Sequence, residues 1–290
     1  MKKIKNYIKL MRVKHYFKNM IVFLPLIFSN NLFNINNALT ALIGFFSFSF
    51  IASSIYIIND IKDCEDDRKN PFKKNRPIAS GKVSIKEAYV LMVLLIICSI
   101  SLNFIINNNI IMAIGLELLY FFMNIMYSIK LKKVPIIDVC IIALGFIIRM
   151  LYGSNITSIS ISNWLYLTVM VGSFFMGFGK RRSELENQGT KSREVLKYYN
   201  KDFLDKFMYV CLGLAIVFYS LWAIDIETIN KIGNNYMIYT IPLIFIILMK
   251  YSFDVESFQF GDPVDIVFKD KFLLLLVLIF GISVLLILYI

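Results

Sequence analysis

The chain has little with which to build a metal centre from histidine or cysteine. Its 290 residues include one histidine and four cysteines, and no two cysteines stand at a CxxC or similar ligand spacing. These absences exclude a histidine-built metal centre or histidine relay and argue against a disulfide framework or a zinc site. Only 18% of the residues are charged. Chemistry must therefore be carried by carboxylates, asparagines, tyrosines and a surplus of lysine and arginine.

Apolar residues, by contrast, are abundant. They make up 58% of the chain, more than one soluble core of this length could hide. A spanning helix needs about 20 mostly apolar residues. The sequence therefore predicts an all-α, polytopic membrane protein, a single domain of residues 1–290 with about nine transmembrane helices. The nine apolar runs, of which the first is short and broken by Pro25, are residues 17–32, 38–58, 88–106, 110–129, 136–152, 164–178, 207–224, 236–249 and 272–290.

The basic residues are unevenly distributed among the connections between these runs. The chain carries 31 lysines and arginines against 20 acidic residues, a formal net charge of +11. When the runs alternate across a bilayer, one side receives every basic residue except Lys231 and Arg149. The positive-inside rule makes that side cytoplasmic, so we expect a multi-pass plasma (inner) membrane protein with a cytoplasmic N-terminus and active site. Its longest cytoplasmic connections, residues 59–87 and 180–206, are candidates for function.

The first of these connections opens with an amide and several carboxylates. If the preceding apolar helix continues into it, Asn59, Asp63 and Asp67 share one face at i, i+4 and i+8 spacing. Asp60 flanks that face. Clustered carboxylates repel one another unless a cation neutralises them, and oxygen ligands of this kind suit Mg²⁺. The alternative is a solvated acidic helix end balanced by neighbouring lysines and arginines.

Two further groups of polar residues lie at other cytoplasmic ends of the apolar runs. Tyr127 and Lys130 end the fourth run, and Asp138 lies about one turn inside the fifth. The lysine could be an interfacial anchor. The aspartate could receive a metal-bound water, accept a sugar hydroxyl or pair with Lys130. Lys180 and Arg181 follow the sixth run, where a phosphate clamp and an anchor to anionic lipid explain them equally well.

Two charges lie away from the cytoplasmic side. Glu117 is in the fourth run and Arg149 is near the outer end of the fifth. Adjacent antiparallel helices would bring them together, so we expect a structural salt bridge between them. The alternative is that Arg149, which follows Asp138 by close to three helical turns, marks the floor of a cavity.

With these residues the chain resembles the UbiA-type intramembrane prenyltransferase superfamily. Members of that superfamily have nine transmembrane helices and an NDxxDxxxD motif, which stands complete here at residues 59–67. Five further elements, occurring in order, resemble its polyprenyl-phosphate (decaprenyl-phosphate) phosphoribosyltransferase branch. They are Lys18-Asn19, NRPIASG at 75–81, YSIKLK at 127–132 followed by Asp138, GFIIR ending at Arg149, and GKR at 179–181.

The chain departs from the superfamily at two places. Aromatic prenyltransferases of the superfamily usually carry a second aspartate-rich motif, DxxxD, near the fifth helix, but the position four after Asp138 is Ile142. The missing carboxylate counts against two magnesium ions clamping a prenyl diphosphate and favours the sugar-donor branch. Arg12 is followed by Val13, where the superfamily commonly has an Arg-Pro pair.

The resemblance implies a magnesium-dependent pentosyltransferase of cell envelope biosynthesis. It would transfer a phosphoribosyl group from 5-phosphoribosyl 1-diphosphate to a membrane polyprenyl phosphate and release diphosphate. The protein must then neutralise the leaving group and align a phosphate that needs little help from a base. By role, the expected residues are Asn59, Asp60, Asp63 and Asp67 for the metal; Asp60, Asp63, Asp67 and Asp138 for catalysis; Lys73, Arg76 and Lys130 for the donor's phosphates; Tyr127 and Asp138 for the ribose; Lys18, Lys180 and Arg181 for the 5-phosphate or the lipid phosphate; and Asn19 and Asn59 for substrate.

Two other functions fit parts of this pattern. An aromatic prenyltransferase of the same superfamily would hold a prenyl diphosphate on the same magnesium cluster, but the missing second motif and the extra cations disfavour it. A transporter would place its polar residues near the midplane on broken helices, whereas here they gather on one side. Membrane lipids are expected partners and nucleic acid is not; formation of a homo-oligomer is left open.

Overall fold

The computed structural model describes residues 2–70, 73–190, 193–257 and 263–290. In these ranges every regular element is a helix, as the sequence predicts, and there is no strand. The chain divides into two compact units, and the expectation of a single domain stays a prediction. Unit 1 is Met1–Leu24, Asn34–Ser128 and Arg149–Ile159; unit 2 is Pro25–Phe33, Ile129–Ile148 and Ser160–Ile290.

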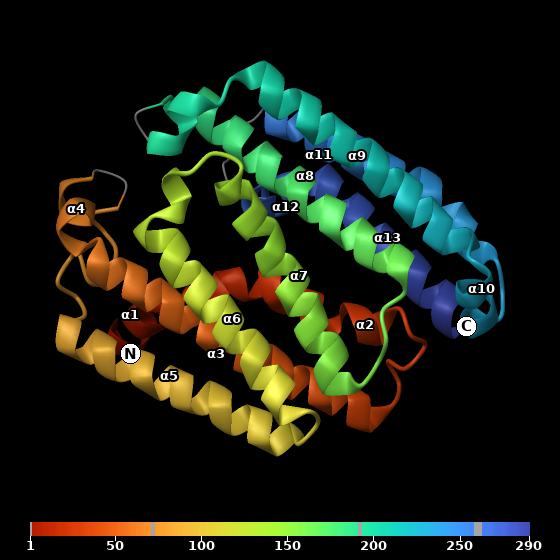
Figure 1. Cartoon of the computed structure of the whole chain (residues 1–290), viewed down its shortest axis with the longest axis horizontal. Coiled ribbons are helices and arrows are strands. Elements are labelled where there is room, and N and C mark those ends of the chain that lie inside the picture. Colours follow the sequence, from red (N-terminus) through yellow and green to blue (C-terminus); the bar gives the residue numbers. More distant parts are fainter. Residues whose placement is uncertain (1, 71–72, 191–192, 258–262) are drawn as a thin grey trace. The chain divides into compact units, whose positions relative to one another are not determined.

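Unit 1 is built around two long helices, α3 (Ile35–Lys62) and α5 (Ile85–Ile106), which pack side by side (Figure 1). The N-terminal segment packs against α3; it consists of α1 (Lys2–Leu10) and the 3-10 helix η1 (Val13–Phe23). The unit is completed by α4 (Cys64–Lys69), α6 (Ile110–Ile129) and the last turns of α7 (Ile137–Thr157).

Glycines allow two very close contacts between helices of unit 1. A Cβ atom at Gly153 in α7 would lie 2.1 Å from the carbonyl oxygen of Val22 in η1. One at Gly44 in α3 would lie 2.1 Å from the Cδ1 atom of Ile156. At Gly153 only a residue without a Cβ permits the approach, because the neighbouring atom belongs to the backbone, whereas the Ile156 methyl near Gly44 is the end of a flexible side chain. The C-terminal end of α7 therefore lies directly against η1 and close to α3.

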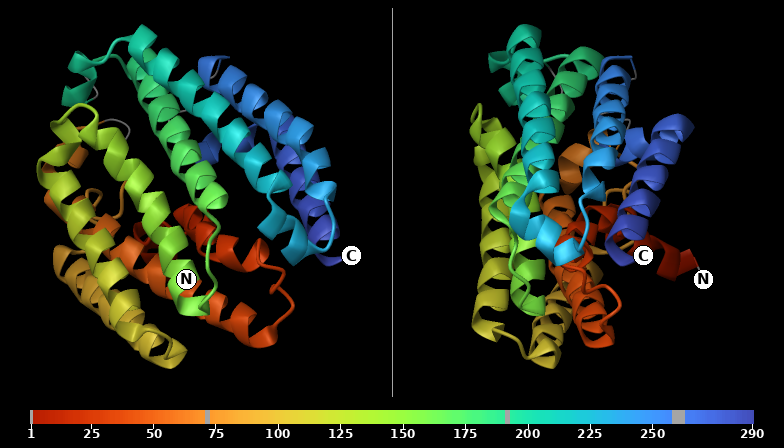
Figure 2. Two further views of the ribbon diagram at one scale, coloured as in Figure 1. Left: turned by 45° about the vertical axis from the view of Figure 1, so that its right-hand side comes forward. Right: turned by 90° about the vertical axis from the view of Figure 1, so that its right-hand side faces the viewer.

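Unit 2 contains most of the remaining helices. Its two longest, α8 (Asn163–Gln188) and α9 (Lys201–Ile224), pack against each other, and α11 (Ile241–Ser257) packs on both of them and on α13 (Lys271–Tyr289) (Figure 2). The first turns of α7 also belong to this unit. Its shorter elements are α2 (Leu24–Ile27), η2 (Leu131–Lys133), η3 (Glu194–Tyr198), α10 (Ile226–Ile232), η4 (Tyr236–Thr240) and α12 (Pro263–Lys269).

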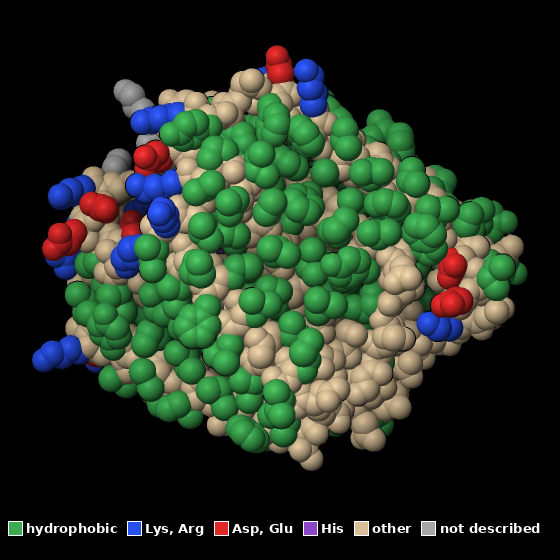
Figure 3. Space-filling view, viewed as in Figure 1, with side chains coloured by type: hydrophobic (Ala, Val, Ile, Leu, Met, Phe, Trp, Pro, Cys, Tyr) green, Lys and Arg blue, Asp and Glu red, His purple; other side chains and the backbone are tan. Residues whose placement is uncertain are grey.

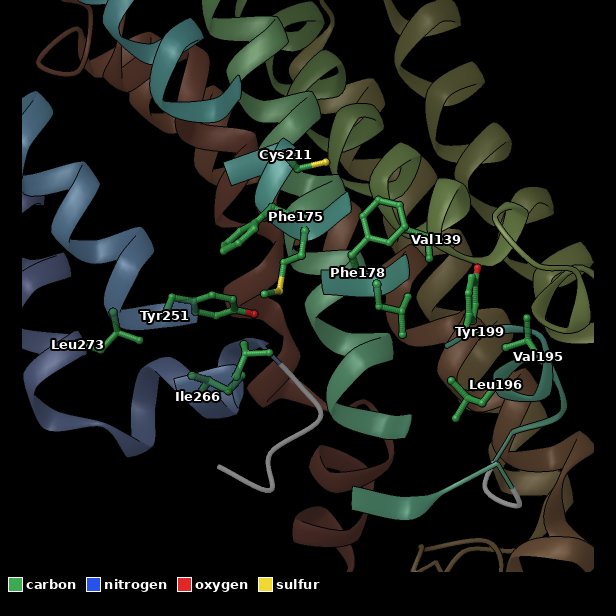
Figure 4. Packing of buried hydrophobic residues seen from close by; sticks show 13 residues of the cluster. Val139, Phe175, Phe178, Val195, Leu196, Tyr199, Cys211, Tyr251, Ile266 and Leu273 are labelled. Atoms are coloured by element: carbon green, nitrogen blue, oxygen red, sulfur yellow. The ribbon is translucent and has the colours of Figure 1, made fainter. Parts of the chain in front are cut away.

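The core of unit 2 joins distant parts of the chain. Figure 4 shows Val139 of α7 and Phe178 of α8 packed near Tyr199, Val195 and Leu196, which belong to or follow η3. Val195 and Leu196 are fully buried. The connection between α8 and α9 is therefore packed against the start of α7 by a hydrophobic cluster.

Seven helices in the described part of the chain are long and apolar enough to cross a membrane. They are α3, α5, α6, α7, α9, α13 and the combined stretch of η4 and α11. The first and sixth predicted runs are not among them, so the count of nine is not confirmed. The first run, with Pro25, forms η1 and the short α2, while the apolar part of α8 ends at Phe178 before three adjacent cations.

The surface of unit 1 is that of a membrane-embedded bundle. Large apolar side chains remain exposed along α5 and α6, among them Val90, Leu94, Ile111 and Phe122. In the region of these helices Figure 3 shows mainly hydrophobic side chains, and the charged ones of unit 1 gather toward α4. Exposed apolar bands of this kind are suited to lipid.

The two predicted connections contain more helix than expected. In residues 59–87, α3 continues to Lys62, α4 follows, and α5 begins at Ile85 behind a capping box of Ser84 and Glu87. In residues 180–206, α8 runs on to Gln188 and α9 begins at Lys201. Both ends of this second connection are therefore helical, because the charged turns continue the winding of their helices.

Candidate functional site

The acidic motif lies on an almost continuous helix. α3 ends at Lys62, and Asp63, with φ −89° and ψ 9°, joins it to α4. The Asp63 N–H donates to the Asn59 carbonyl at 2.9 Å, and the Asp67 N–H donates to the Asp63 carbonyl at 2.8 Å. Helical i to i+4 hydrogen bonds therefore carry across the junction. The predicted continuation of the helix past the apolar run is confirmed, with one interruption.

Within this motif the two buried carboxylates belong to Asp60 and Asp67, each only 2% exposed. Both are held by Arg76, whose Nη1 atom lies 3.1 Å from Asp60 Oδ1 and 2.6 Å from Asp67 Oδ2. Lys73 lies 4.0 Å from Asp67. The structure thus brings two predicted phosphate-binding cations, Arg76 and Lys73, onto the predicted metal-binding carboxylates. Buried carboxylates of this kind need such partners.

A second arginine, not predicted as a site residue, completes this cluster. Arg12 donates from Nη2 to Asp60 Oδ1 at 2.6 Å, and its guanidinium lies 4.8 Å from the centre of the Tyr56 ring. Its backbone is left-handed, with φ 53° and ψ 47°, at the junction of α1 and η1. Strained conformations of this type occur where a side chain must be aimed. The feature of the sequence that could have revealed this arginine was the Arg12-Val13 pair, which stands where the superfamily commonly has an Arg-Pro pair.

The donor set of the motif suits a hard divalent cation. Asn59 Oδ1 is buried and has no hydrogen-bond partner among the described residues. Asp63 is half-buried, and its carboxylate forms no ion pair with another described residue. Amide and carboxylate oxygens are the ligands that Mg²⁺ prefers. Nevertheless, no three acidic, histidine or cysteine side chains of the described residues converge tightly enough to hold a metal, because Arg76 lies between Asp60 and Asp67.

The other predicted residues of unit 1 divide between two places. Tyr127 is half-buried and precedes Ser128, whose carbonyl accepts a hydrogen bond from Lys62 at 3.2 Å, so the end of α6 lies beside the end of α3. Asn19 is buried elsewhere: it donates to Ser49 Oγ at 2.9 Å and accepts from Arg149 Nε at 2.7 Å. Lys18, its neighbour, is half-buried. These contacts give Asn19 structural partners, and its predicted role in binding substrate stays a prediction.

The expected salt bridge between Glu117 and Arg149 is wrong. The Glu117 carboxyl is bonded by Ser47 at 2.7 Å, Ser99 at 2.9 Å and Asn103 at 2.8 Å. Arg149 instead bonds Asn19 and, at 2.7 Å, the Tyr120 hydroxyl. Each charge has found neutral partners on other helices of unit 1, which no spacing along one helix could reveal.

Unit 2 contains a second buried ion cluster, around Asp138. Arg181 donates from Nε to Asp138 Oδ2 at 2.5 Å and also pairs with Glu184; Asp138 and Arg181 are both fully buried. The pairing of Asp138 with Lys130, one of the alternatives, is therefore wrong, and Lys130 is exposed. Lys180, next to Arg181, is half-buried. Asp138 and Arg181 serve first as partners of each other.

Tyr199 is the main residue of this second cluster that the sequence did not reveal. Its hydroxyl donates to Asp138 Oδ1 at 2.6 Å and accepts from the Ile136 N–H at 2.6 Å. Ile136 has a φ of 68°, an unusual value for a β-branched residue, so the hydroxyl fixes a strained turn. Burial and the hydrogen bond to Asp138 both raise the pKa of the Tyr199 hydroxyl, which therefore remains the donor. Glu184 forms a further ion pair in this cluster, in which Arg193 Nε lies 3.4 Å from Glu184 Oε2.

Comparison with known proteins connects these features to a family. The profile described as "UbiA prenyltransferase family" matches residues 20–257. The chain is 33% identical over 278 residues to the decaprenyl-phosphate phosphoribosyltransferase of Corynebacterium glutamicum, covering 93% of this chain and 83% of that protein. It is 34% identical over 247 residues to the enzyme of the same name from Mycolicibacterium smegmatis, covering 81% and 76%.

Solved structures resemble the fold as a whole. A UbiA homologue from Archaeoglobus fulgidus, bound to GPP and Mg²⁺, has a TM-score of 0.68 and 18% sequence identity, covering 97% of this chain and 99% of that one. The same homologue bound to DMAPP and Mg²⁺ gives a TM-score of 0.69 at 17% identity. Likeness at this level of identity establishes the fold alone.

Proposed function

Because the chain belongs to the UbiA prenyltransferase family, we propose that it transfers a phosphoribosyl group from 5-phosphoribosyl 1-diphosphate to a membrane polyprenyl phosphate, releasing diphosphate. The observation that carries this proposal is the 33% identity, over 93% of the chain, to an enzyme named decaprenyl-phosphate phosphoribosyltransferase. No observation favours the alternative, an aromatic prenyltransferase, over phosphoribosyl transfer.

The charged residues of unit 1 support the transfer of a group from a diphosphate donor to a phosphate acceptor. Loss of diphosphate leaves positive charge on the anomeric carbon and ring oxygen, and the leaving group carries the excess negative charge. Arg12, Lys73 and Arg76 supply cations at the acidic motif and would neutralise that charge. A phosphate monoester is itself nucleophilic, so alignment counts for more than a general base. This agrees with a cluster that contains neither histidine nor cysteine.

A divalent cation, most simply Mg²⁺, belongs to the proposal. Asn59, Asp60, Asp63 and Asp67 would hold it, and the unpartnered Asn59 Oδ1 supports that assignment. When bound, the ion would neutralise the diphosphate and help it leave. The magnesium named with the A. fulgidus homologue is consistent with the same choice.

The remaining predicted residues have the following proposed roles. Tyr127, at the end of α6 beside the end of α3, would orient the ribose. Lys18, Lys130 and Lys180 keep the role that the sequence predicts for each of them, the binding of a phosphate group. Asp138 and Arg181 would act as a buried pair that positions the start of α7 and the end of α8. We also propose that the N-terminus and the acidic motif face the cytoplasm, where the sugar donor is made.

The proposal is tested with purified protein, Mg²⁺, ribose-labelled 5-phosphoribosyl 1-diphosphate and a polyprenyl phosphate in detergent or liposomes. Label that enters the organic phase only in the presence of both substrates supports it. Label that enters the lipid phase only from a prenyl diphosphate and a phenolic acceptor would instead support the aromatic prenyltransferase. A matched reaction with Asp63→Ala protein controls for contaminating activity.

A further inference from the structure

In unit 1 the Nη1 atom of Arg76 lies between two carboxylates that a bound metal ion would also use. Arg76 Nη1 contacts Asp60 Oδ1 at 3.1 Å and Asp67 Oδ2 at 2.6 Å, so a single guanidinium nitrogen bridges both buried carboxylates. Among the carboxylates of the motif, these two are the most buried. In the proposed metal site, a divalent cation would use oxygens from the same pair.

Arg76 and a divalent cation cannot occupy this position together. One guanidinium balances half of the charge of two carboxylates, and Arg12 adds a second positive charge at Asp60. A divalent cation in contact with the Arg76 guanidinium would therefore meet strong repulsion in a site of low dielectric constant. Binding of the ion therefore requires the guanidinium to withdraw from at least one of the two carboxylates. Of the two carboxylates, Arg12 contacts only that of Asp60, so its guanidinium can remain in place.

The local structure leaves the Arg76 side chain able to move while its backbone stays fixed. The backbone of residues 73–80 is tied by hydrogen bonds from the Arg76 N–H to the Lys73 carbonyl at 2.9 Å and from the Ser80 N–H to the Arg76 carbonyl at 2.9 Å. Ser80 Oγ adds a bond to the same carbonyl at 2.7 Å. The Arg76 side chain itself is 27% exposed, against 2% and 3% for the carboxylates that it joins.

We infer that Arg76 is an exchangeable counter-ion: it occupies the acidic motif in the absence of metal, and a divalent cation displaces its guanidinium, which then binds the donor's phosphate groups. The inference rests on the proposed function for the divalent cation and for the identity of that anion. Its consequence is an order of events, in which the cation binds before the donor. The two buried carboxylates thereby keep cationic partners until the metal binds, and the phosphate-binding arginine is released only after the metal has bound.

The competition predicts that removing the arginine strengthens metal binding. Mn²⁺ affinity of the purified full-length protein, measured by electron paramagnetic resonance without donor, should rise about tenfold or more in Arg76→Gln, because the ion no longer displaces a cation. Arg76→Lys retains the charge but loses the planar fork, so its affinity should lie between those of Arg76→Gln and the wild type. Arg68→Gln is the matched control; Arg68 bonds the Ala79 carbonyl at 3.2 Å and neither carboxylate, so its Mn²⁺ affinity should be unchanged.

A second readout separates exchange from general damage. In Arg76→Gln the KM for the donor should rise although metal affinity has risen, and a merely disordered site would weaken both. If Arg76→Gln does not fold, Arg76→Lys decides the question on the same two measurements. Mn²⁺ affinity equal to or weaker than that of the wild type in the folded variant would overturn the inference. If tighter Mn²⁺ binding is found in a protein that transfers no phosphoribosyl group, the competition stands and the proposed function falls.

Discussion

At the scale of single residues, the acidic motif contains two kinds of aspartate. Asp60 and Asp67 are buried and held by arginines, so their removal would take carboxylate partners away from Arg12 and Arg76. Asp63, half-buried between α3 and α4, forms no ion pair with another described residue. No contact that the structure shows makes the Asp63 carboxylate necessary for folding, which agrees with its proposed role in binding the metal.

Asp63→Ala should therefore abolish transfer without unfolding the protein. We expect activity to fall more than about a hundredfold, since a ligand of the ion that stabilises the leaving group is lost. The apparent melting temperature in detergent should stay within a degree or two of the wild type. Glu65→Ala, an exposed position of α4 outside the motif, is the control and should keep full activity. Normal activity of Asp63→Ala would remove this residue from the metal site.

The buried charges of unit 1 allow a second prediction at this scale. Glu117 bonds Ser47, Ser99 and Asn103, and Arg149 bonds Asn19 and Tyr120, so the two charges do not depend on each other. Reversing both, with Glu117→Arg and Arg149→Glu, should not restore the expression lost in either single variant. Recovery of expression in the double variant, measured by fluorescence-detected size-exclusion chromatography, would show that the side chains do pair.

At the scale of helices, the apolar runs of the sequence predicted the helices better than the spacing of charges predicted the contacts between them. The apolar runs placed α3, α5, α6, α7, α9, α11 and α13, and the shared face of the acidic motif assumed that α3 continues into it, as the structure shows. The 3-10 helix at residues 13–23 was not foreseen, because its geometry depends on packing against α3. Nor was the contact of Arg181 with Asp138, since it depends on which faces of α7 and α8 meet.

The contact between α7 and η1 can be tested at Gly153. A methyl group there would lie 2.1 Å from a backbone oxygen of Val22, which cannot move aside as a side chain can. Gly153→Ala should lower stability by about 1–3 kcal/mol. Gly115→Ala is the matched control, because nothing lies within 4 Å of its added methyl, and a better helix former should leave stability equal or slightly higher. Equal thermal stability of the two variants would contradict the close packing.

The start of α7 gives another prediction at this scale. Tyr199→Phe removes the hydroxyl that bonds both Asp138 and the Ile136 N–H, leaving buried polar groups unpaired. The cost should be about 1–3 kcal/mol, whereas Tyr198→Phe, at an exposed position, should cost almost nothing. Thermal denaturation of the two variants in detergent measures this difference, and equal stability would contradict the bonding role of Tyr199.

The stability that Tyr199 provides should depend on pH in one direction. Its raised pKa means that the folded state favours the protonated hydroxyl. The contribution is therefore fully present below the unfolded tyrosine pKa of about 10 and is lost as pH rises through the folded value. The difference in stability between wild type and Tyr199→Phe should thus be constant from about pH 6 to 9 and shrink above that range. A difference that already declines between neutral and pH 9 would contradict this assignment.

At the scale of the whole molecule, composition was the most informative property of the sequence. A chain with 58% hydrophobic residues and a net charge of +11 belongs in a membrane, and seven described helices are suited to crossing one. The ordered motifs led to the same family as the comparisons. Much of the candidate site could not be predicted, because Arg12, Arg76 and Asp60 come from segments 16 or 48 residues apart that only the fold brings together.

The central claim concerns which group is transferred, and a donor labelled at two places tests it directly. 5-Phosphoribosyl 1-diphosphate would carry one isotope in the ribose and another in the β-phosphate of its diphosphate, and would be incubated with polyprenyl phosphate, Mg²⁺ and the purified protein. The account predicts that the ribose label moves into the lipid while the β-phosphate label leaves as water-soluble diphosphate, in equal amounts. Both labels remaining in the aqueous donor, in a preparation that transfers prenyl groups to an aromatic acceptor, would contradict it.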